Sequence, residues 1–356
     1  MEKNSFCYFD NLYHTFIIAE AGSNWKVGTY EEDFQMAKKM IDVAANAGAD
    51  AIKFQTFRSE TVYAPNAGQV EYLSESKKAK SINELFNELS MPYEMIPKLA
   101  DHCEKQNIMF MSSVFSVEDA KQVDPYVKIH KVASYEINHI RLLESLAKTG
   151  KQILISTGAS TYDEIDFAVN LMKKNESGQI GLLQCTSKYP SPIEALNISC
   201  IPKIKERYHL PVGFSDHSTD PLIGPLLAIG MGATLIEKHF TLDRTFKGPD
   251  HFFALNPDDL TKMINAIREA DKAKGTGKKE ILTEEKELRM FATRSIQATK
   301  NISRGELLRQ GINFDILRPG DHKRGAEPRF LFQINGKKAM RDINVGEGIV
   351  QSDCEG

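Results

Sequence analysis

Short apolar runs alternate with longer amphipathic stretches over about the first 270 residues of the chain. Each run has the length of a strand, and each stretch repeats its apolar residues with the period of a helix. The eight runs are FIIAE (16–20), AIKFQTF (51–57), IMFMSSV (108–114), VKIHKVAS (127–134), QILISTG (152–158), IGLLQCT (180–186), PVGFSDH (211–217) and TLIEKHFT (234–241). The clearest helical stretches are 31–49, 94–107, 140–150, 162–175 and 256–275. Strand and helix in alternation predict a parallel sheet with helical crossovers.

The number of units favours a closed (β/α)8 TIM barrel over an open sheet. An open, doubly wound sheet is the alternative. The segment after the first run, AEAGSNW, lacks the GxGxxG spacing of a dinucleotide-binding turn. Gly48, Gly150 and Gly232 each stand between a helical stretch and the next run, where a helix C-cap is expected. We therefore predict an α/β barrel over residues 1–275.

The composition and the spacing of apolar residues change after the predicted barrel. Residues 276–293 are charged and poor in large apolar side chains, which is typical of a linker with some helix. Residues 294–356 hold short alternating segments separated by glycine turns, which predict a small β-rich domain. A core of about 60 residues is marginal alone. We expect this domain to be stabilised by contacts with the barrel or with another subunit.

Composition excludes several classes of protein. The net charge of −3 gives no global attraction for nucleic acid, so an anionic ligand would need a local cluster of cations. Five cysteines without a CxxC pair argue against a disulfide framework or a structural zinc site, and favour a reducing cytoplasm. The longest apolar-rich run, 222–236, is too short and too interrupted by Gly and Pro to span a membrane.

Polar or ionisable side chains end every predicted strand. In a (β/α)8 barrel all these ends meet at one mouth, where catalytic groups lie. We therefore expect one active site there. Its candidates are Glu20, Lys53, Gln55, Ser112, Ser113, Lys131, Ser134, Glu136, Ser156, Thr157, Gln184, Thr186, Ser187, Ser215, Asp216, His217, Lys238 and His239.

His217 and His239 come from neighbouring strand ends and could share a divalent metal. Glu20 and Asp250 could complete the site with carboxylate or water ligands. Mixed nitrogen and oxygen ligation suits Mn, Fe, Co or Zn better than Ca. The alternative is a pair of hydrogen-bonded core histidines.

Lys53 and Lys131 lie inside apolar runs, and a buried lysine needs an anion beside it. One interpretation is a salt bridge to Glu20 or Glu136 inside the barrel. The functional alternatives are a Schiff-base lysine and a clamp for phosphate and carboxylate groups. Hydroxyl groups around the same mouth favour a small, multiply anionic ligand. They belong to Ser134, Ser156, Ser187 and Ser215.

A set of motifs, in order along nearly the whole chain, resembles the sialic acid synthase family. The motifs are IAEAGSN, KFQTF, KVAS, STGAS, LLQCTSKYP, GFSDHS, EKHFTLD and KGPDH. The closing segments ILRPG and INGKKAMRDINVGE resemble that family's antifreeze-like SAF domain, a β-clip. The resemblance implies a domain-swapped homodimer in which each small domain caps the partner's barrel. It also implies metal-dependent condensation of phosphoenolpyruvate with an N-acetylated mannosamine-type sugar.

The resemblance assigns roles residue by residue. His217 and His239 would bind the metal, with Mn²⁺ favoured and Mg²⁺ or Co²⁺ as alternatives, and Glu20 would be the acid near the reacting carbons. The phosphoenolpyruvate-binding positions would be Lys53, Lys131, Ser134, Ser156, Ser187 and Ser215. The sugar-binding positions would be Tyr189, Asp250 and, across the dimer, Arg318; Gln55 and Glu136 are further substrate-binding candidates at the strand ends. The alternative role for Tyr189 is packing before Pro190. The alternative for Arg318 is a solvated position in a turn.

Two departures from the family pattern leave the exact sugar open. Trp25 stands where several relatives carry His, Ser187 stands where some carry Asn, and both are expected near the mouth. N-acetylmannosamine would give N-acetylneuraminate. A 2,4-diacetamido-trideoxy hexose would give a legionaminic or pseudaminic type acid. A Schiff-base pyruvate aldolase and a non-catalytic sugar-acid binding protein are the rival functions.

Overall fold

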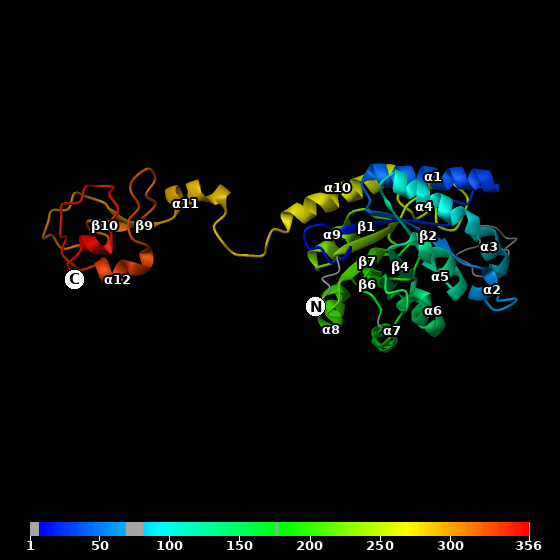
Figure 1. The fold of residues 1–356 in the computed structure, drawn as a ribbon. Helices are drawn as coiled ribbons and strands as arrows, with labels where there is room; N and C mark the ends of the chain where they lie inside the picture. Colours follow the sequence, from blue (N-terminus) through cyan, green and yellow to red (C-terminus); the bar gives the residue numbers. More distant parts are fainter. Residues whose placement is uncertain (1–6, 69–80, 176, 356) are drawn as a thin grey trace. The chain divides into compact units, whose positions relative to one another are not determined.

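The computed structural model describes residues 7–68, 81–175 and 177–355. The chain divides into two compact units, Met1–Gly275 and Thr276–Gly356. The first unit is a closed barrel of eight parallel strands in sequential order (Figure 1). Its strands are β1 (Phe16–Gly22), β2 (Ala51–Thr56), β3 (Met109–Val114), β4 (Ile129–Val132), β5 (Gln152–Ser156), β6 (Ile180–Cys185), β7 (Val212–Asp216) and β8 (Leu235–His239). Every predicted run contains one strand, so the (β/α)8 prediction is confirmed.

Helices surround this barrel. They are α1 (Tyr30–Ala47), α2 (Ser59–Val62), α3 (Ile82–Leu89), α4 (Ile96–Lys105), α5 (Val117–Val123), α6 (Ile140–Ala147), α7 (Tyr162–Lys174), α8 (Cys200–Tyr208), α9 (Ile223–Gly230) and α10 (Pro257–Ala273). The five clearest predicted stretches contain α1, α4, α6, α7 and α10. Gly48, Gly150 and Gly232 have positive φ angles of 89°, 69° and 96°, which a helix C-terminus before a strand requires. The apolar run 222–236 is α9 followed by β8. Within the described part of the chain, no helix has the length and apolar character to cross a membrane.

Two apolar layers hold the barrel together. The larger lies between the strands and the helices. The smaller consists of Phe9, Phe16, Ile18, Ala51, Met111, Ile129, Leu154, Leu183 and Leu235. These residues come from seven strands and from the segment before β1, so they form an apolar floor inside the barrel. Gly181 leaves room for Phe9 there, since a Cβ at Gly181 would lie 2.8 Å from Cε2 of that ring.

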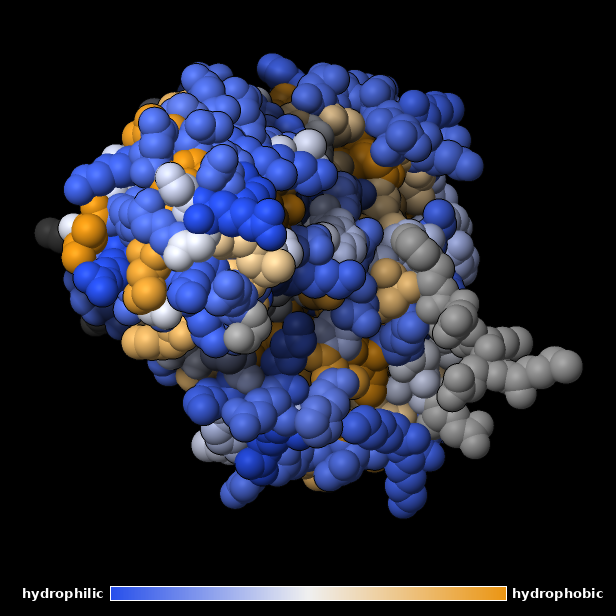
Figure 2. Space-filling model, turned by 90° about the vertical axis from the view of Figure 1, so that its left-hand side faces the viewer, coloured by the Kyte–Doolittle hydropathy of each residue, from blue (hydrophilic) through white to orange (hydrophobic). Residues whose placement is uncertain are grey.

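The second unit has its own small core. Its antiparallel strands are β9 (Ser295–Ala298) and β10 (Phe314–Leu317), and its helices are α11 (Lys286–Ala292) and α12 (Leu331–Ile334). The core residues are Ile296, Ala298, Ile302, Leu308, Phe314, Ala326, Ile334, Ala339, Ile343, Ile349 and Cys354. Helix α11 falls within the predicted linker 276–293. The face drawn in Figure 2 is predominantly hydrophilic, with hydrophobic side chains in separate small groups.

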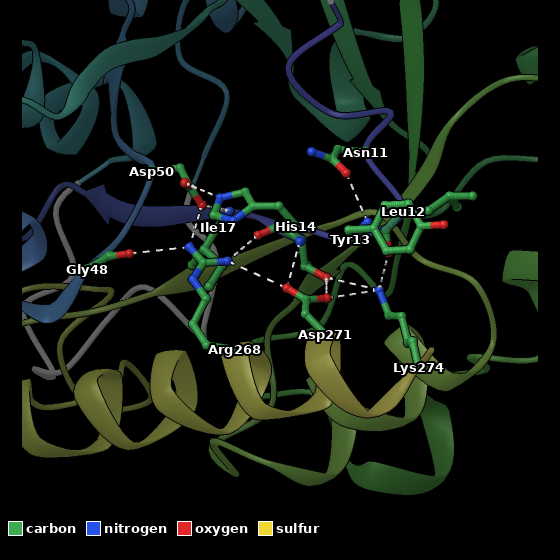
Figure 3. A network of polar contacts seen from close by, with 11 residues as sticks. Asn11, Leu12, Tyr13, His14, Ile17, Gly48, Asp50, Arg268, Asp271 and Lys274 are labelled. Carbon is green, nitrogen blue, oxygen red and sulfur yellow. Dashed lines mark hydrogen bonds and ion pairs between the residues drawn. The ribbon is translucent and has the colours of Figure 1, made fainter. Parts of the chain in front are cut away.

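A polar network ties the start of β1 to helix α10 (Figure 3). Asp271 accepts hydrogen bonds from the Thr15 backbone N (2.8 Å) and Oγ1 (2.6 Å), and lies 2.9 Å from Nζ of Lys274. Arg268 donates to the Thr15 carbonyl (2.6 Å) and to Asp50 (2.8 Å). Because Thr15 directly precedes β1, these contacts fix the first strand against the last helix of the barrel.

We expect Asp271→Asn to lower the free energy of unfolding by about 1.5–3 kcal/mol, because two charge-assisted hydrogen bonds weaken in a buried site. Trp25 is the only tryptophan in the chain and is 1% exposed, so its fluorescence during urea unfolding reports the barrel. Glu269→Gln, in an exposed ion pair on the same helix, is the matched control and should change stability by less than about 0.5 kcal/mol. Equal losses in both variants would contradict the role given to this network.

Candidate active site

A layer of polar side chains lies directly above the apolar floor. Side chains two residues apart on a strand point to the same face, so a strand that puts an apolar residue into the floor puts its next inward residue above it. That next residue is polar or ionisable on most strands. The pairs are Ile18 and Glu20, Ala51 and Lys53, Met111 and Ser113, Ile129 and Lys131, Leu154 and Ser156, Leu183 and Cys185, and Leu235 and Glu237.

Four charged side chains meet in this layer, and we call Glu20, Lys53, Lys131 and Glu237 the buried quartet. Lys53 forms an ion pair with Glu20, donates to Oγ of Ser113 (3.0 Å) and lies 3.8 Å from Oε2 of Glu237. Nζ of Lys131 lies 3.5 Å from Oε1 of Glu237. Each of the four is at most 5% exposed. The predicted salt bridge between Lys53 and Glu20 is therefore present, and Glu237 is its unforeseen neighbour.

The quartet shifts the protonation of its members. Burial acts to lower the pKa of Lys53, but the Glu20 and Glu237 carboxylates outweigh it and leave that pKa raised. Burial lowers the pKa of Lys131. Burial also raises the pKa of Glu20 to about 7; Lys53 opposes this rise and Glu237 adds to it. Glu20 can therefore gain or lose a proton near neutral pH, beside a lysine that stays charged.

Hydroxyl groups surround the quartet. Oγ of Ser156 accepts from Lys131 (2.8 Å), and Oγ of Ser215 donates to Oε1 of Glu237 (2.9 Å). Oγ of Ser134 accepts from the Gly158 backbone N (3.0 Å). Oγ of Ser187 is buried and has no hydrogen-bond partner among the described residues, so it is free to donate to a ligand.

Gly158 keeps the space between two of these serines open. A Cβ at this position would lie 2.3 Å from Oγ of Ser187 and 2.9 Å from Oγ of Ser134. Both distances are too short for a side chain. The four serines predicted for the site are thus brought together with the two predicted lysines, around a position that glycine leaves open.

His217 and His239 face each other with ring centroids 5.5 Å apart. Nδ1 of His217 lies 2.8 Å from the Thr186 carbonyl and can donate to it, which leaves Nε2 with its lone pair. Nδ1 of His239 is buried, and the described residues offer it no partner. Two imidazoles, each with an uncommitted ring nitrogen, fit a pair of ligands for a divalent metal.

The predicted carboxylate ligands are engaged elsewhere. Glu20 pairs with Lys53 and accepts from Nε2 of Gln55 (3.0 Å), and Asp250 accepts from Oγ of Ser23 (2.9 Å). Residues 7–68, 81–175 and 177–355 contain no group of three or more His, Cys, Asp or Glu side chains that could hold a metal ion. The expectation that Glu20 and Asp250 complete a protein-built metal site therefore finds no support, and a metal here would rely on the two histidines and on non-protein ligands.

A pocket of about 490 Å³ opens next to this layer. Several residues predicted for the site line it, namely Gln55, Ser134, Glu136, Tyr189, His239 and Asp250, of which Tyr189 and Asp250 are the predicted sugar-binding positions. The Tyr189 ring lies 4.2 Å from the His217 ring, centroid to centroid, so it stands against the histidine pair. This volume is within the usual range for a small-molecule site.

Some residues lie elsewhere than expected. Trp25 is buried in the hydrophobic layer between strands and helices, just after the carboxyl end of β1, and its effect on the choice of sugar stays a prediction. Arg318 directly follows β10 in the second unit, and its predicted role stays a prediction. Ser112, Thr157, Gln184, Asp216 and Lys238 bond to side chains or carbonyls of the barrel wall and its loops.

Lys238 is the clearest of these structural residues. Its Nζ donates to Oδ2 of Asp216 (2.6 Å) and to the carbonyls of Ser218 (2.7 Å) and Asp220 (2.9 Å). Both charged side chains are about 1% exposed or less. The pair therefore fixes the loop after β7 against β8, and these two segments carry His217 and His239.

We expect Lys238→Met to cost about 3–5 kcal/mol of unfolding free energy, because the Asp216 carboxylate would stay buried without a counter-charge. Urea unfolding followed by Trp25 fluorescence measures this. Lys203→Met is the matched control, since Lys203 pairs with Glu206 at the exposed surface and its loss should cost less than about 1 kcal/mol. A loss for Lys238→Met no larger than for the control would refute the loop-fixing role.

Glu136 should make stability depend on pH. Burial, helped by the charge of Asp119, raises its pKa from 4.5 to about 7. The folded state thus keeps this proton while the unfolded state releases it, so this group's contribution to stability falls as pH rises from about 4.5 to about 7. The Glu136→Gln variant lacks this titrating carboxyl, so its stability does not fall for this reason as pH rises. Its stability relative to the unmodified protein should increase over this interval and level off above it, as measured by urea unfolding at successive pH values; a constant difference would contradict the assignment.

Comparison with known proteins agrees with this geometry. The NeuB family matches residues 40–279. The chain is 37% identical to the spore coat polysaccharide biosynthesis protein SpsE of Bacillus subtilis, across 95% of this chain and 93% of that protein. It is 34% identical to a pseudaminic acid synthase of Campylobacter jejuni, across 98% of both chains. Among solved structures, the N-acetylneuraminic acid (sialic acid) synthetase of Leptospira borgpetersenii superposes with a TM-score of 0.67 at 36% identity, over 77% of this chain and 90% of that one. The resemblance found in the sequence is thus confirmed, and the chain belongs to the NeuB family.

Proposed function

We propose that this protein condenses phosphoenolpyruvate with an N-acetylated amino sugar of the mannosamine type, giving a nine-carbon 2-keto-3-deoxy acid and phosphate. The observation that carries the proposal is the buried quartet with its serines. Two lysines and an unpartnered Ser187 hydroxyl beside the open space at Gly158 suit a ligand with a phosphate and a carboxylate. Relatives named as pseudaminic and sialic acid synthases support the same class of reaction.

Lys53 and Lys131 would hold the anionic groups of phosphoenolpyruvate. Their own counter-charges, Glu20 and Glu237, are already buried with them, so an incoming dianion or trianion adds negative charge to a balanced site. The pKa of Glu20, about 7, leaves part of this carboxyl ionised near neutral pH, in the form that can accept a proton. Ser134, Ser156, Ser187 and Ser215 would donate hydrogen bonds to the same groups.

The bond-forming step joins C3 of phosphoenolpyruvate to the aldehyde carbon of the open-chain sugar. A divalent metal held by His217 and His239, with Mn²⁺ favoured over Mg²⁺ or Co²⁺, would supply Lewis-acid polarisation of that aldehyde. Positive charge then develops at C2, and water adds there while Glu20 takes up its proton. The intermediate expels phosphate by cleavage of the bond between C2 and the phosphate oxygen. The C2 hydroxyl loses its proton, which leaves the keto group, and the oxygen of the former aldehyde gains a proton and becomes a hydroxyl of the product.

The second unit would complete the site in a dimer. The family resemblance of residues 294–356 to an antifreeze-like SAF domain supports a domain-swapped homodimer, with Arg318 of each chain reaching the sugar in the partner's barrel. We propose a cytoplasmic location from the five cysteines, all of which are free.

Phosphate release from phosphoenolpyruvate by EDTA-stripped protein tests the function. We expect release only when both Mn²⁺ and an N-acetylated amino sugar are added. Glu20→Gln should retain phosphoenolpyruvate binding and lower kcat by about 100-fold or more, while Glu206→Gln, an exposed position on α8, is the matched control with unchanged kcat. Normal turnover of Glu20→Gln would remove Glu20 from the chemistry. Trapping of pyruvate on the protein by borohydride, with no metal requirement, would instead establish a Schiff-base aldolase.

A further inference from the structure

Glu237 is a buried charged group to which the proposed reaction gives no task. It is 5% exposed, and it faces Ser215 in the register of β7 and β8, where Oγ of Ser215 donates to its Oε1 (2.9 Å). Its other neighbours are the ammonium groups of Lys53 and Lys131. A carboxylate between two lysines that also accepts a hydrogen bond from a hydroxyl stays ionised. Glu237 therefore places a negative charge beside the groups that would bind phosphoenolpyruvate.

Glu237 reaches the centre of the barrel. Strands β8 and β4 are four strands apart in a closed barrel of eight, so they stand on opposite sides of it. The ion pair between Glu237 and Lys131 therefore crosses the interior. Lys53 extends from β2, between these two sides, and lies near the same carboxylate. Among the residues that the structure describes, Glu237 is the only carboxylate in ion pairs with both lysines.

Glu237 balances the charge of the two lysines without occupying all their hydrogen bonds. Its Oε1 lies 3.5 Å from Nζ of Lys131 and its Oε2 lies 3.8 Å from Nζ of Lys53, and both distances exceed that of a charge-assisted hydrogen bond. Oε2 accepts no hydrogen bond from the described part of the chain. An ammonium group has three N–H donors, and the contacts of each lysine within the barrel leave at least one for a ligand.

The same lysines must release a phosphate ion at the end of each turnover. Two buried ammonium groups with hydroxyl groups around them form a strong site for phosphate, whether it belongs to the substrate or is the product. Tight retention of a product makes its release the slow step of a reaction. A negative charge that stays beside both lysines opposes this retention, because charges in a buried site are little screened.

We propose that Glu237 is a positioning residue for Lys53 and Lys131, and that its charge limits how tightly the two lysines retain phosphate. In the empty site it is the shared counter-charge that keeps both ammonium groups in place. In the occupied site it repels the bound phosphate and speeds its departure. The proposal rests on the proposed function for the origin of the phosphate, whereas binding of added inorganic phosphate tests it without any turnover.

The binding of inorganic phosphate is measured from the urea midpoint of Trp25 fluorescence at several phosphate concentrations, with chloride at equal ionic strength as the reference. We expect Glu237→Gln to bind phosphate about tenfold or more tightly than the unmodified protein, because the site then carries one more positive charge. Glu237→Asp keeps the charge and should move the affinity back toward that of the unmodified protein. Glu206→Gln, in an exposed pair on α8, is the matched control with unchanged affinity.

Each result of this measurement decides the proposal. Equal or weaker binding of phosphate by a folded Glu237→Gln protein would overturn it. If this variant does not fold in chloride alone, phosphate should restore the fold, because the anion supplies the counter-charge that the lysines have lost. A variant that is unfolded in both salts would also refute the role given to Glu237.

Kinetics separate this role from a merely structural one. With phosphoenolpyruvate and an N-acetylated amino sugar, Glu237→Gln should lower both kcat and KM of phosphoenolpyruvate by about tenfold, since release of phosphate becomes limiting. The rate of the first turnover, followed by rapid quench, should fall by less than about threefold. A raised KM, or a first turnover slowed as much as kcat, would contradict the proposal. Absence of turnover with every sugar tested would refute the proposed function, and the phosphate-binding result would still decide the role of Glu237.

Discussion

The burial of four charges inside the barrel is the constraint on which the rest of this structure depends. Moving isolated lysines and glutamates out of water costs several kcal/mol each, so Glu20, Lys53, Lys131 and Glu237 are stable there only as neighbours of one another. They come from four different strands, β1, β2, β4 and β8, and only a closed barrel brings these together. Burial in this cluster raises the pKa of Glu20 to about 7 against the opposing charge of Lys53, and the proposed chemistry uses this property.

Strand alternation links this constraint to the fold. Ile18 and Glu20, or Leu235 and Glu237, are two residues apart, so one strand direction supplies both the apolar floor and the charge above it. A side chain one residue further along the strand points to the opposite face. Lys238, next to Glu237, points the other way and ties a loop to the barrel wall, although both residues are charged and buried.

The sequence predicts the barrel well because hydrophobic periodicity is a local signal. It also predicts Lys53, Lys131, the serines and the two histidines, since all strand ends of a barrel meet at one mouth. The sequence analysis does not single out Glu237, because the run 234–241 is interpreted from Lys238 and His239 near its end. Glu237 lies two residues before His239, so strand alternation places both side chains on the same face. The burial of Trp25 is not predicted, because the sequence does not show that a loop residue just after a strand turns into the outer layer. The ring contacts of Phe57 with Phe86 and with Phe115 are not predicted, since they join residues far apart in the sequence.

The buried quartet and the pocket beside it depend on different elements. The quartet and its serines are held by strands and the loops directly after them, where small displacements would leave charges unpaired. Phe57, Tyr63 and Phe86, after β2 and in α3, line the pocket and pack on one another. Substitutions of these aromatic residues would thus change the pocket without removing an ion pair of the quartet.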